Sequence, residues 1–297
     1  MEKQQKFPHN QKNGGLAFSA MIVIYLFLIL FLSPVVEVIF EKDSTAYVLA
    51  SSTFSILSML AVILIKIVAD KGCEKKPLFS FNAFKWQYSI LAVCLCLGML
   101  FGLGFLNQVV ANVLTGLKLN VSNGTTFVID TPIKFVAFIF FIAVLPAVVE
   151  EMFFRGILLN SLKDSKPVQA VLTVAFCFSL YHCSATQFVY QFIFGALLCL
   201  IAIGAKSIIP CIIAHFLNNF IILLFEYVKF NVNLLNPLII ACGCAVLAVS
   251  VVLIITALKK LNQKSGCESV KTFYLPYGVL GLGACVALLI GSLFVVG

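Results

Sequence analysis

The sequence predicts an all-α protein that crosses a membrane many times, a polytopic helical bundle of about eight to nine transmembrane helices. Hydrophobic residues make up 62% of the chain and charged residues only 11%. The mean hydropathy is +1.09. A soluble domain of this length does not need so much apolar surface, so the composition indicates an integral membrane protein.

Nine apolar stretches are long enough to form helices, with boundaries predicted to within about four residues. In chain order they cover residues 16–40, 46–69, 87–114, 131–162, 167–186, 188–204, 207–228, 236–258 and 274–296. Gly98 and Gly102 are four residues apart in the third stretch. This spacing lets two helix backbones approach closely, and we expect it to serve packing within the protein rather than dimerisation.

Lysine clusters indicate how the chain is oriented. They precede the first helix and follow the second, fourth, sixth and eighth helices, at Lys3, Lys6, Lys12, Lys71, Lys75, Lys76, Lys85, Lys163, Lys166, Lys206, Lys259, Lys260, Lys264 and Lys271. The opposite loops carry only Lys42, Lys118 and Lys229. The positive-inside rule therefore predicts a cytoplasmic N-terminus and an external C-terminus. The net charge of +8 then reflects topology and anionic lipid headgroups, and nucleic acid binding is not expected.

Eleven cysteines raise the question of a metal centre or of disulfides. Most of them lie in apolar helices without the Cys-x-x-Cys spacing of metal and redox sites. We therefore expect them to be small hydrophobic side chains.

Three ionisable residues stand out inside the fourth apolar stretch: Glu150, Glu151 and, four residues later, Arg155, which is the single arginine of the chain. Charged groups at bilayer depth are costly and indicate a functional site. On a helix Glu151 and Arg155 share a face, whereas Glu150 points about 100° away. We predict a Glu151–Arg155 ion pair, with Glu150 left as a general base. Alternatively, the motif is only an ion pair that locks two helices together. Pro146 removes the hydrogen bond to the carbonyl of Ile142 and is expected to kink this helix, making room for water.

Two further helices carry a histidine with a partner one turn away. Phe178 and His182 share a face, and so do His215 and Asn219. His182 on its own would more often be an interhelical histidine than a catalyst. An imidazole beside a carboxamide can hold a water molecule and donate to an oxyanion. Asn218 is expected to point elsewhere and to bind only backbone.

These three motifs, Glu150-Glu151-x-x-x-Arg155, Phe178-x-x-x-His182 and His215-x-x-x-Asn219, occur in this order on successive helices. As a set they resemble the CAAX protease and bacteriocin-processing (CPBP, or Abi) family of intramembrane endopeptidases. That family includes the Ras-converting CAAX endoprotease and proteins like lysostaphin resistance protein A. Signatures of other intramembrane hydrolases, such as His-Glu-x-x-His, do not occur.

The resemblance covers residues 130–225, which it implies are the catalytic core. Residues 1–125 and 235–297 would then be additional transmembrane helices that are candidates for setting substrate choice. In the core, a family member would be expected to have a second glycine four residues after Gly195, where this chain has Cys199. This departure concerns helix packing rather than catalysis.

The resemblance implies an intramembrane endopeptidase that hydrolyses a peptide bond of a membrane-associated or lipidated peptide or protein. Glu150, together with His182, would activate the attacking water. His215 and Asn219 would stabilise the oxyanion.

The resemblance leaves the cofactor open. Glu150, His182 and His215 would suffice as ligands of a divalent metal such as zinc, with water in the fourth position, but another base would then be needed. We favour the mechanism in which Glu150 is the base, with Glu151 and Arg155 supporting the site.

Two other functions remain alternatives at this point. One is a non-catalytic bacteriocin self-immunity or adaptor protein of the same family, and the other is a transporter with Glu150 and the histidines as a proton relay. A transporter should show internal repeats with paired broken helices, and the sequence shows none. We expect a multi-pass protein of the bacterial cell membrane whose partners are membrane lipid and a peptide or protein substrate. A prenylated tail, a pheromone precursor and a bacteriocin leader are all compatible substrates.

Overall fold

The computed structural model describes residues 11–42, 44–69, 81–119, 121, 128–230, 232–260 and 268–294. Within these ranges the chain is helical and contains no β-strand, which confirms the predicted all-α class. Eight helical segments in the described residues are long and apolar enough to cross a membrane, and a ninth apolar helix is shorter. The predicted multi-pass fold is therefore confirmed. The lysines expected at 3, 6, 71, 75, 76 and 264 lie outside the described residues.

Two of the first four crossings, the third and the fourth, are not regular α-helix throughout. The elements of all four crossings are α1 (Gln11–Ile39), α2 (Thr45–Ala69), α3 (Gln87–Leu103), α4 (Phe105–Gly116), α5 (Pro132–Phe138), the π-helical segment η1 (Ile139–Val144), α6 (Leu145–Glu151) and the π-helical segment η2 (Met152–Leu159). Gly104 separates α3 from α4. The fourth crossing, from α5 to η2, alternates between α- and π-helix.

The second half of the chain adds five more apolar helices. Its elements are α7 (Pro167–Tyr181), α8 (Phe188–Ala205), α9 (Ile209–Tyr227), α10 (Pro237–Lys260), the short α11 (Lys271–Phe273), the π-helical segment η3 (Tyr274–Gly278) and α12 (Val279–Phe294). The predicted helix over 167–186 ends early, at Tyr181. Cys183 has a left-handed backbone (φ 48°), which cannot continue an α-helix.

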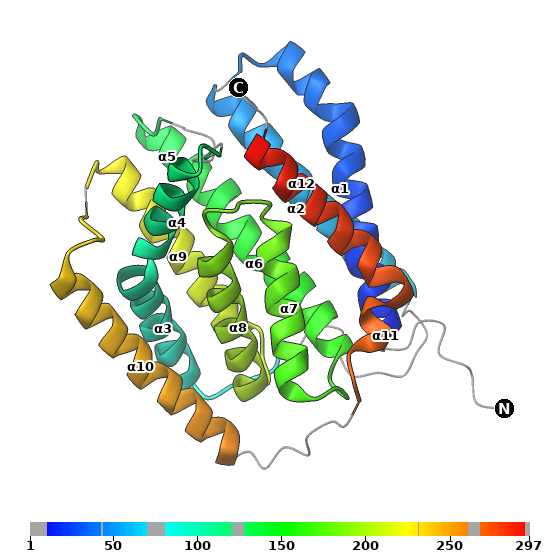
Figure 1. Cartoon of the computed structure of the whole chain (residues 1–297), viewed down its shortest axis with the longest axis vertical. Coiled ribbons are helices and arrows are strands. Elements are labelled where there is room, and N and C mark those ends of the chain that lie inside the picture. The colour runs from blue at the N-terminus through cyan, green and yellow to red at the C-terminus, as the bar shows by residue number, and fades with distance from the viewer. Residues whose placement is uncertain are drawn as a thin grey trace.

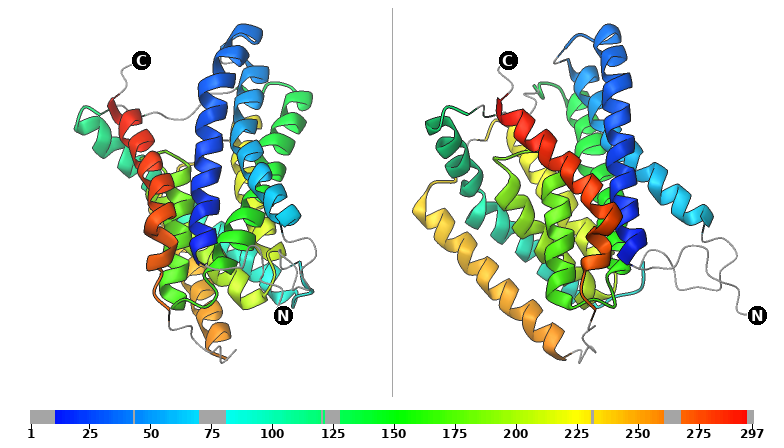
Figure 2. Two further views of the ribbon diagram at one scale, coloured as in Figure 1. Left: turned by 90° about the vertical axis from the view of Figure 1, so that its right-hand side faces the viewer. Right: turned by 45° about the vertical axis from the view of Figure 1, so that its right-hand side comes forward.

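The bundle has a central group of helices with a further group on each side. The crossing from α5 to η2 lies with α7, α8 and α9 in the middle, α1, α2 and α12 pack along one side, and α3 and α10 pack along the other (Figure 1). The start of α1 and the end of α12 lie at opposite ends of the bundle (Figure 2). This arrangement agrees with an odd number of crossings.

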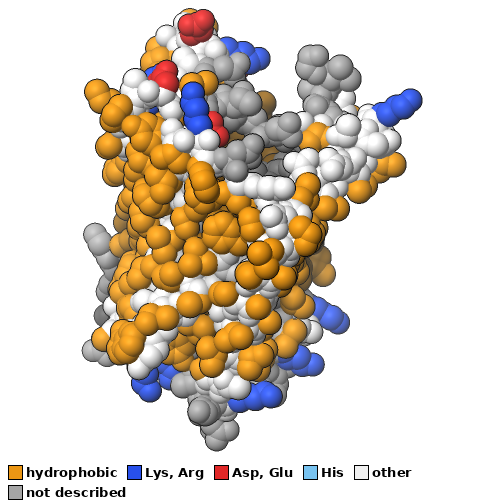
Figure 3. Space-filling view, turned by 90° about the vertical axis from the view of Figure 1, so that its left-hand side faces the viewer, with side chains coloured by type: hydrophobic (Ala, Val, Ile, Leu, Met, Phe, Trp, Pro, Cys, Tyr) orange, Lys and Arg blue, Asp and Glu red, His pale blue; other side chains and the backbone are white. Residues whose placement is uncertain are grey.

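The surface has the layered polarity of a membrane protein. In Figure 3 hydrophobic side chains cover the middle of the face, while lysines lie towards both of its ends and acidic side chains towards the upper end. Many large apolar side chains are exposed, including Leu30 at 68% and Ile133 at 83%. Such exposure is expected where lipid, rather than water, covers the side chain.

Glycines bring α3 and α10 into backbone contact. A Cβ atom added at Gly98 would lie 2.7 Å from the backbone nitrogen of Leu247, and one at Gly102 would lie 2.6 Å from the backbone nitrogen of Cys244. On the α10 side, a Cβ added at Gly243 would collide with the backbone of Gly102. The prediction that this glycine pair serves packing within the protein is confirmed.

Gly102→Ala should therefore destabilise the bundle, by about 1–3 kcal/mol, because the new methyl group overlaps the backbone of α10. Gly283→Ala is the matched control, since a Cβ there meets nothing within 4 Å. Thermal unfolding in detergent should show a lower midpoint for Gly102→Ala and an unchanged or higher one for the control. Equal midpoints would contradict the close approach.

Candidate active site

A buried ion pair joins the two ends of the Glu-Glu-x-x-x-Arg motif. Glu151 is 0% and Arg155 is 3% exposed, and Arg155 Nη1 donates to Glu151 Oε1 at 2.7 Å. This contact confirms the predicted pair. Arg155 Nη2 also donates to the carbonyl oxygen of Gly195 at 3.0 Å, and the guanidinium carbon lies 4.7 Å from the centroid of the Phe178 ring. The charge of Arg155 is thus compensated by three different elements, α6, α8 and α7.

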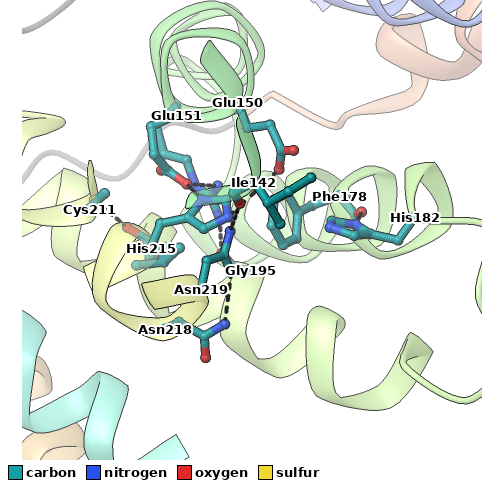
Figure 4. A network of polar contacts seen from close by, with 12 residues as sticks. Ile142, Glu150, Glu151, Phe178, His182, Gly195, Cys211, His215, Asn218 and Asn219 are labelled. Atoms are coloured by element: carbon teal, nitrogen blue, oxygen red, sulfur yellow. Dashed lines mark hydrogen bonds and ion pairs between the residues drawn. The ribbon is translucent and has the colours of Figure 1, made fainter. Parts of the chain in front are cut away.

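His215 lies between the two glutamates (Figure 4). Its Nδ1 is 2.9 Å from Glu151 Oε1, and its Nε2 is 3.9 Å from Glu150 Oε2. Because a carboxylate only accepts, Nδ1 carries the proton of this hydrogen bond and donates it to Glu151. The second ring nitrogen therefore faces Glu150.

Glu150 is buried without a hydrogen bond to its Oε2 atom. It is 6% exposed, and Oε2 has no hydrogen-bond partner among the described residues. The predicted difference between the two carboxylates is present in the geometry, since Glu151 binds both Arg155 and His215 while Glu150 points away from it (Figure 4). A carboxylate with a free oxygen beside an imidazole has the chemistry of a general base.

His182 lies at the C-terminal end of α7. Its Nδ1 is 2.7 Å from the carbonyl oxygen of Phe178, and its ring packs edge-on against Phe178 and Tyr181 with centroid distances of 4.7 Å and 5.3 Å. The backbone bond places the proton on Nδ1 and leaves Nε2 able to accept. No hydrogen bond connects His182 to Glu150 in the described part of the chain. Phe178 also packs 5.9 Å from His215, so this phenylalanine touches both histidines and Arg155.

Asn219 donates a hydrogen bond to the backbone carbonyl that Pro146 leaves without a donor. Its Nδ2 donates to the carbonyl oxygen of Ile142 at 3.1 Å, and Ile142 belongs to the π-helical segment directly before the proline. The predicted disturbance of this helix is present, and an asparagine side chain satisfies the freed carbonyl. One of the two amide hydrogens of Asn219 is used in this bond.

Asn218 supports Asn219 and does not bind backbone. Its Nδ2 donates to Asn219 Oδ1 at 3.1 Å, and its Oδ1 accepts from the hydroxyl of Tyr190 at 2.7 Å. The prediction that Asn218 binds only backbone was therefore wrong, because its side chain forms hydrogen bonds with the side chains of Tyr190 on α8 and Asn219 on α9. Tyr190, which sequence reasoning missed, is 4% exposed and is the residue that connects α8 to this chain of hydrogen bonds. The feature of the sequence that could have indicated this role is a tyrosine hydroxyl within a long apolar helix, because such a hydroxyl needs a hydrogen-bond partner.

The donors named as metal ligands do not form a preformed metal site. Among the described residues, no three side chains of His, Cys, Asp or Glu are grouped so that they could hold one ion. Glu150 and His215 approach each other, but the three named donors are not grouped around one point in the described part of the chain.

The helix around Gly195 packs closely in spite of the cysteine at the family's second glycine position. A Cβ added at Gly195 would lie 3.1 Å from the Phe178 ring, so glycine here brings α8 close enough to accept from Arg155. Cys199 is 0% exposed, and all cysteines in the described part of the chain are free thiols. The departure is accommodated by burial of the thiol.

The fold and the site together define a class: a multi-pass helical membrane protein with a buried carboxylate, imidazole and guanidinium cluster. Residues 132–221 match the model of a family described as Type II CAAX prenyl endopeptidase Rce1-like. The match runs from the start of α5 into α9 and contains all three motifs, which confirms the predicted resemblance to CAAX proteases. Comparisons with curated proteins and with solved structures gave no match.

Removing either partner of the buried pair should destabilise the protein strongly. Glu151→Ala and Arg155→Ala each leave an uncompensated charge in a dry environment, at a cost of about 3–5 kcal/mol. Glu226→Ala is a suitable control, because Glu226 is exposed near the end of α9. Thermal unfolding in detergent should give lower midpoints for both variants than for the control. Wild-type midpoints for both would show that the pair does not stabilise the bundle.

Proposed function

We propose that the protein is an intramembrane endopeptidase in which Glu150 activates water for attack on a peptide bond. The observation that carries this proposal is the unpartnered, buried Oε2 of Glu150, which lies 3.9 Å from an imidazole within the segment that matches an endopeptidase family. The substrate is a peptide or protein in or at the membrane. The description of the family suggests that it carries a prenyl group.

In the proposed mechanism Glu150 takes a proton from water as the oxygen attacks the carbonyl carbon. It then returns that proton to the leaving amine while the carbon–nitrogen bond breaks. His182, whose Nε2 accepts, orients the water. His215 and Asn219 stabilise the oxyanion. Because Nδ1 of His215 already donates to Glu151, donation from Nε2 requires the doubly protonated, cationic form of His215, and Asn219 uses its second amide hydrogen.

The geometry around the histidines favours a metal-free version of this mechanism. Glu150, His182 and His215 do not group as three ligands among the described residues. Glu150 would also have to act as ligand and base at once if it bound a metal. We therefore propose that zinc or another divalent ion is not needed for water activation.

Glu150→Gln should abolish proteolysis while the protein stays folded, since the amide keeps the shape of the side chain and removes the base. We expect membrane-derived peptide fragments that appear with the wild type to be missing with this variant. His182→Ala should slow their release by about 10²–10⁴-fold. Glu226→Gln, on an exposed carboxylate of α9, should release them at the wild-type rate.

Elemental analysis of the same purified proteins completes this test. Little metal in wild type and in His182→Ala agrees with the metal-free mechanism. One equivalent of zinc in the wild type that is lost in His182→Ala would contradict it. Identical fragment profiles for wild type and Glu150→Gln would contradict proteolysis itself and favour an immunity or adaptor protein.

We infer that the end of the bundle where α1 starts faces the cytoplasm. Of the described residues, Lys163, Lys166 and Lys206 lie in connections at that end. At the opposite end Lys134, which forms a 2.8 Å ion pair with Asp130, is one lysine more than the three named from the sequence. The lysine clusters still outnumber the lysines at that end, and this asymmetry supports a cytoplasmic N-terminus.

Reporter fusions should test this orientation. A fluorescent reporter that matures only in the cytoplasm should be active after Lys166 and Lys206, and a phosphatase active only outside should be active after Leu119 and Asn233. Inverted activity at any one site would mean that a helix does not cross the membrane. Inversion at all four would overturn the orientation.

A further inference from the structure

A separate cavity opens at the lysine-rich end of the bundle, on the side of Arg155 away from the candidate base. It has a volume of about 300 Å³ and lies between the end of η2, the start of α7 and the end of α8. Its size is at the lower end of the range of small-ligand sites. Of the candidate active-site residues, Arg155 lines it, whereas Glu150 and the two histidines do not.

The charges that line this cavity are all positive. Lys163, Lys206 and Arg155 line it, and no carboxylate does so in the described part of the chain. Lys163 and Lys206 are exposed and form no ion pair with a described residue, whereas the charge of Arg155 is compensated by Glu151. A ligand that enters the cavity from the membrane surface would therefore meet two ammonium groups, those of Lys163 and Lys206, that no described carboxylate compensates.

Two buried hydroxyl groups in the lining can donate hydrogen bonds. Ser165 and Ser207 are 2% and 1% exposed. Ser165 Oγ accepts from Gln11 Nε2 at 3.2 Å, and Ser207 Oγ accepts from the backbone nitrogen of Ile209 at 3.4 Å. Neither hydroxyl donates to an acceptor in the described residues, so both hydrogens are available to an anion.

Apart from Asn160, the rest of the wall is apolar, which separates this cavity from a site for a free ion. The apolar lining consists of Leu159, Leu162, Pro167, Ala170, Ala202, Ile203 and Ile208. Cations at the membrane surface above an apolar wall between transmembrane helices match an amphiphile with an anionic head. The backbone adds one more sign of specialisation, because Lys206 ends α8 in the left-handed conformation (φ 52°) where glycine is usual.

We propose that this cavity binds the phosphate group of an anionic membrane lipid. Lys163 and Lys206 attract the phosphate, the hydroxyls of Ser165 and Ser207 donate to its oxygens, and the apolar wall contacts the start of the acyl chains. The proposal is independent of proteolysis, since it requires neither Glu150 nor either histidine.

Lipid binding to the purified full-length chain in neutral detergent tests the proposal. Phosphatidylglycerol should bind saturably and raise the unfolding midpoint, and phosphatidylcholine with the same acyl chains should not. Lys163→Gln/Lys206→Gln should weaken phosphatidylglycerol binding about 25-fold, because each lysine near an anionic headgroup contributes about fivefold. Lys259→Gln/Lys271→Gln is the matched control, with the same loss of charge at the same end but outside the cavity.

Three results would overturn the proposal. Equal weakening by the two double variants would show general attraction to a basic surface. Equal binding of phosphatidylglycerol and phosphatidylcholine would show that the headgroup charge is not recognised. A full rise of the unfolding midpoint with inorganic phosphate alone, abolished by Lys163→Gln/Lys206→Gln, would assign the cavity to the free ion.

Discussion

The guanidinium of Arg155 is the group around which the central helices are arranged. A cation in a membrane-spanning helix is stable only when other groups replace its hydration. Here Glu151, the carbonyl of Gly195 and the ring of Phe178 do so. Through them one buried charge fixes the relative positions of η2, α7 and α8, and the bond from Glu151 to His215 extends the same network to α9.

A second constraint comes from the proline that interrupts the same membrane crossing. Pro146 cannot donate to the carbonyl of Ile142, and a buried carbonyl in an apolar environment needs a donor. Asn219 supplies it, and Asn218 and Tyr190 hold Asn219 in turn. Because Pro146 and Glu150 are one turn apart, this clamp also fixes the position of the candidate base relative to α9.

Local features of the site could be predicted from the sequence, and long-range ones could not. The Glu151–Arg155 pair follows from helical periodicity, as does the shared face of Phe178 and His182. The bond between Glu151 and His215 joins residues 64 positions apart, so it depends on how α6 packs against α9. Asn218 illustrates the limit of helical periodicity. Periodicity predicts the direction of Asn218 relative to Asn219, but it cannot predict that the Tyr190 hydroxyl of α8 lies beside Asn218. Helix ends set by a left-handed residue, as at Cys183, are equally invisible to hydrophobic periodicity.

The charges of the buried cluster bear on the proposed role of Glu150. Two ionised carboxylates and one guanidinium leave a single negative charge while His215 is neutral, and Glu150, Glu151 and Arg155 are all less than 10% exposed. An uncompensated charge in a dry interior is unfavourable, and a proton either on Glu150 or on Nε2 of His215 brings the cluster to neutrality. Proton transfer from water to Glu150 therefore moves the negative charge from the carboxylate to the attacking oxygen and then to the oxyanion, where hydrogen-bond donors stabilise it. Glu151 lacks this capacity, because its charge is already matched by Arg155. The two adjacent carboxylates thus differ in function because only one of them has a cation of its own.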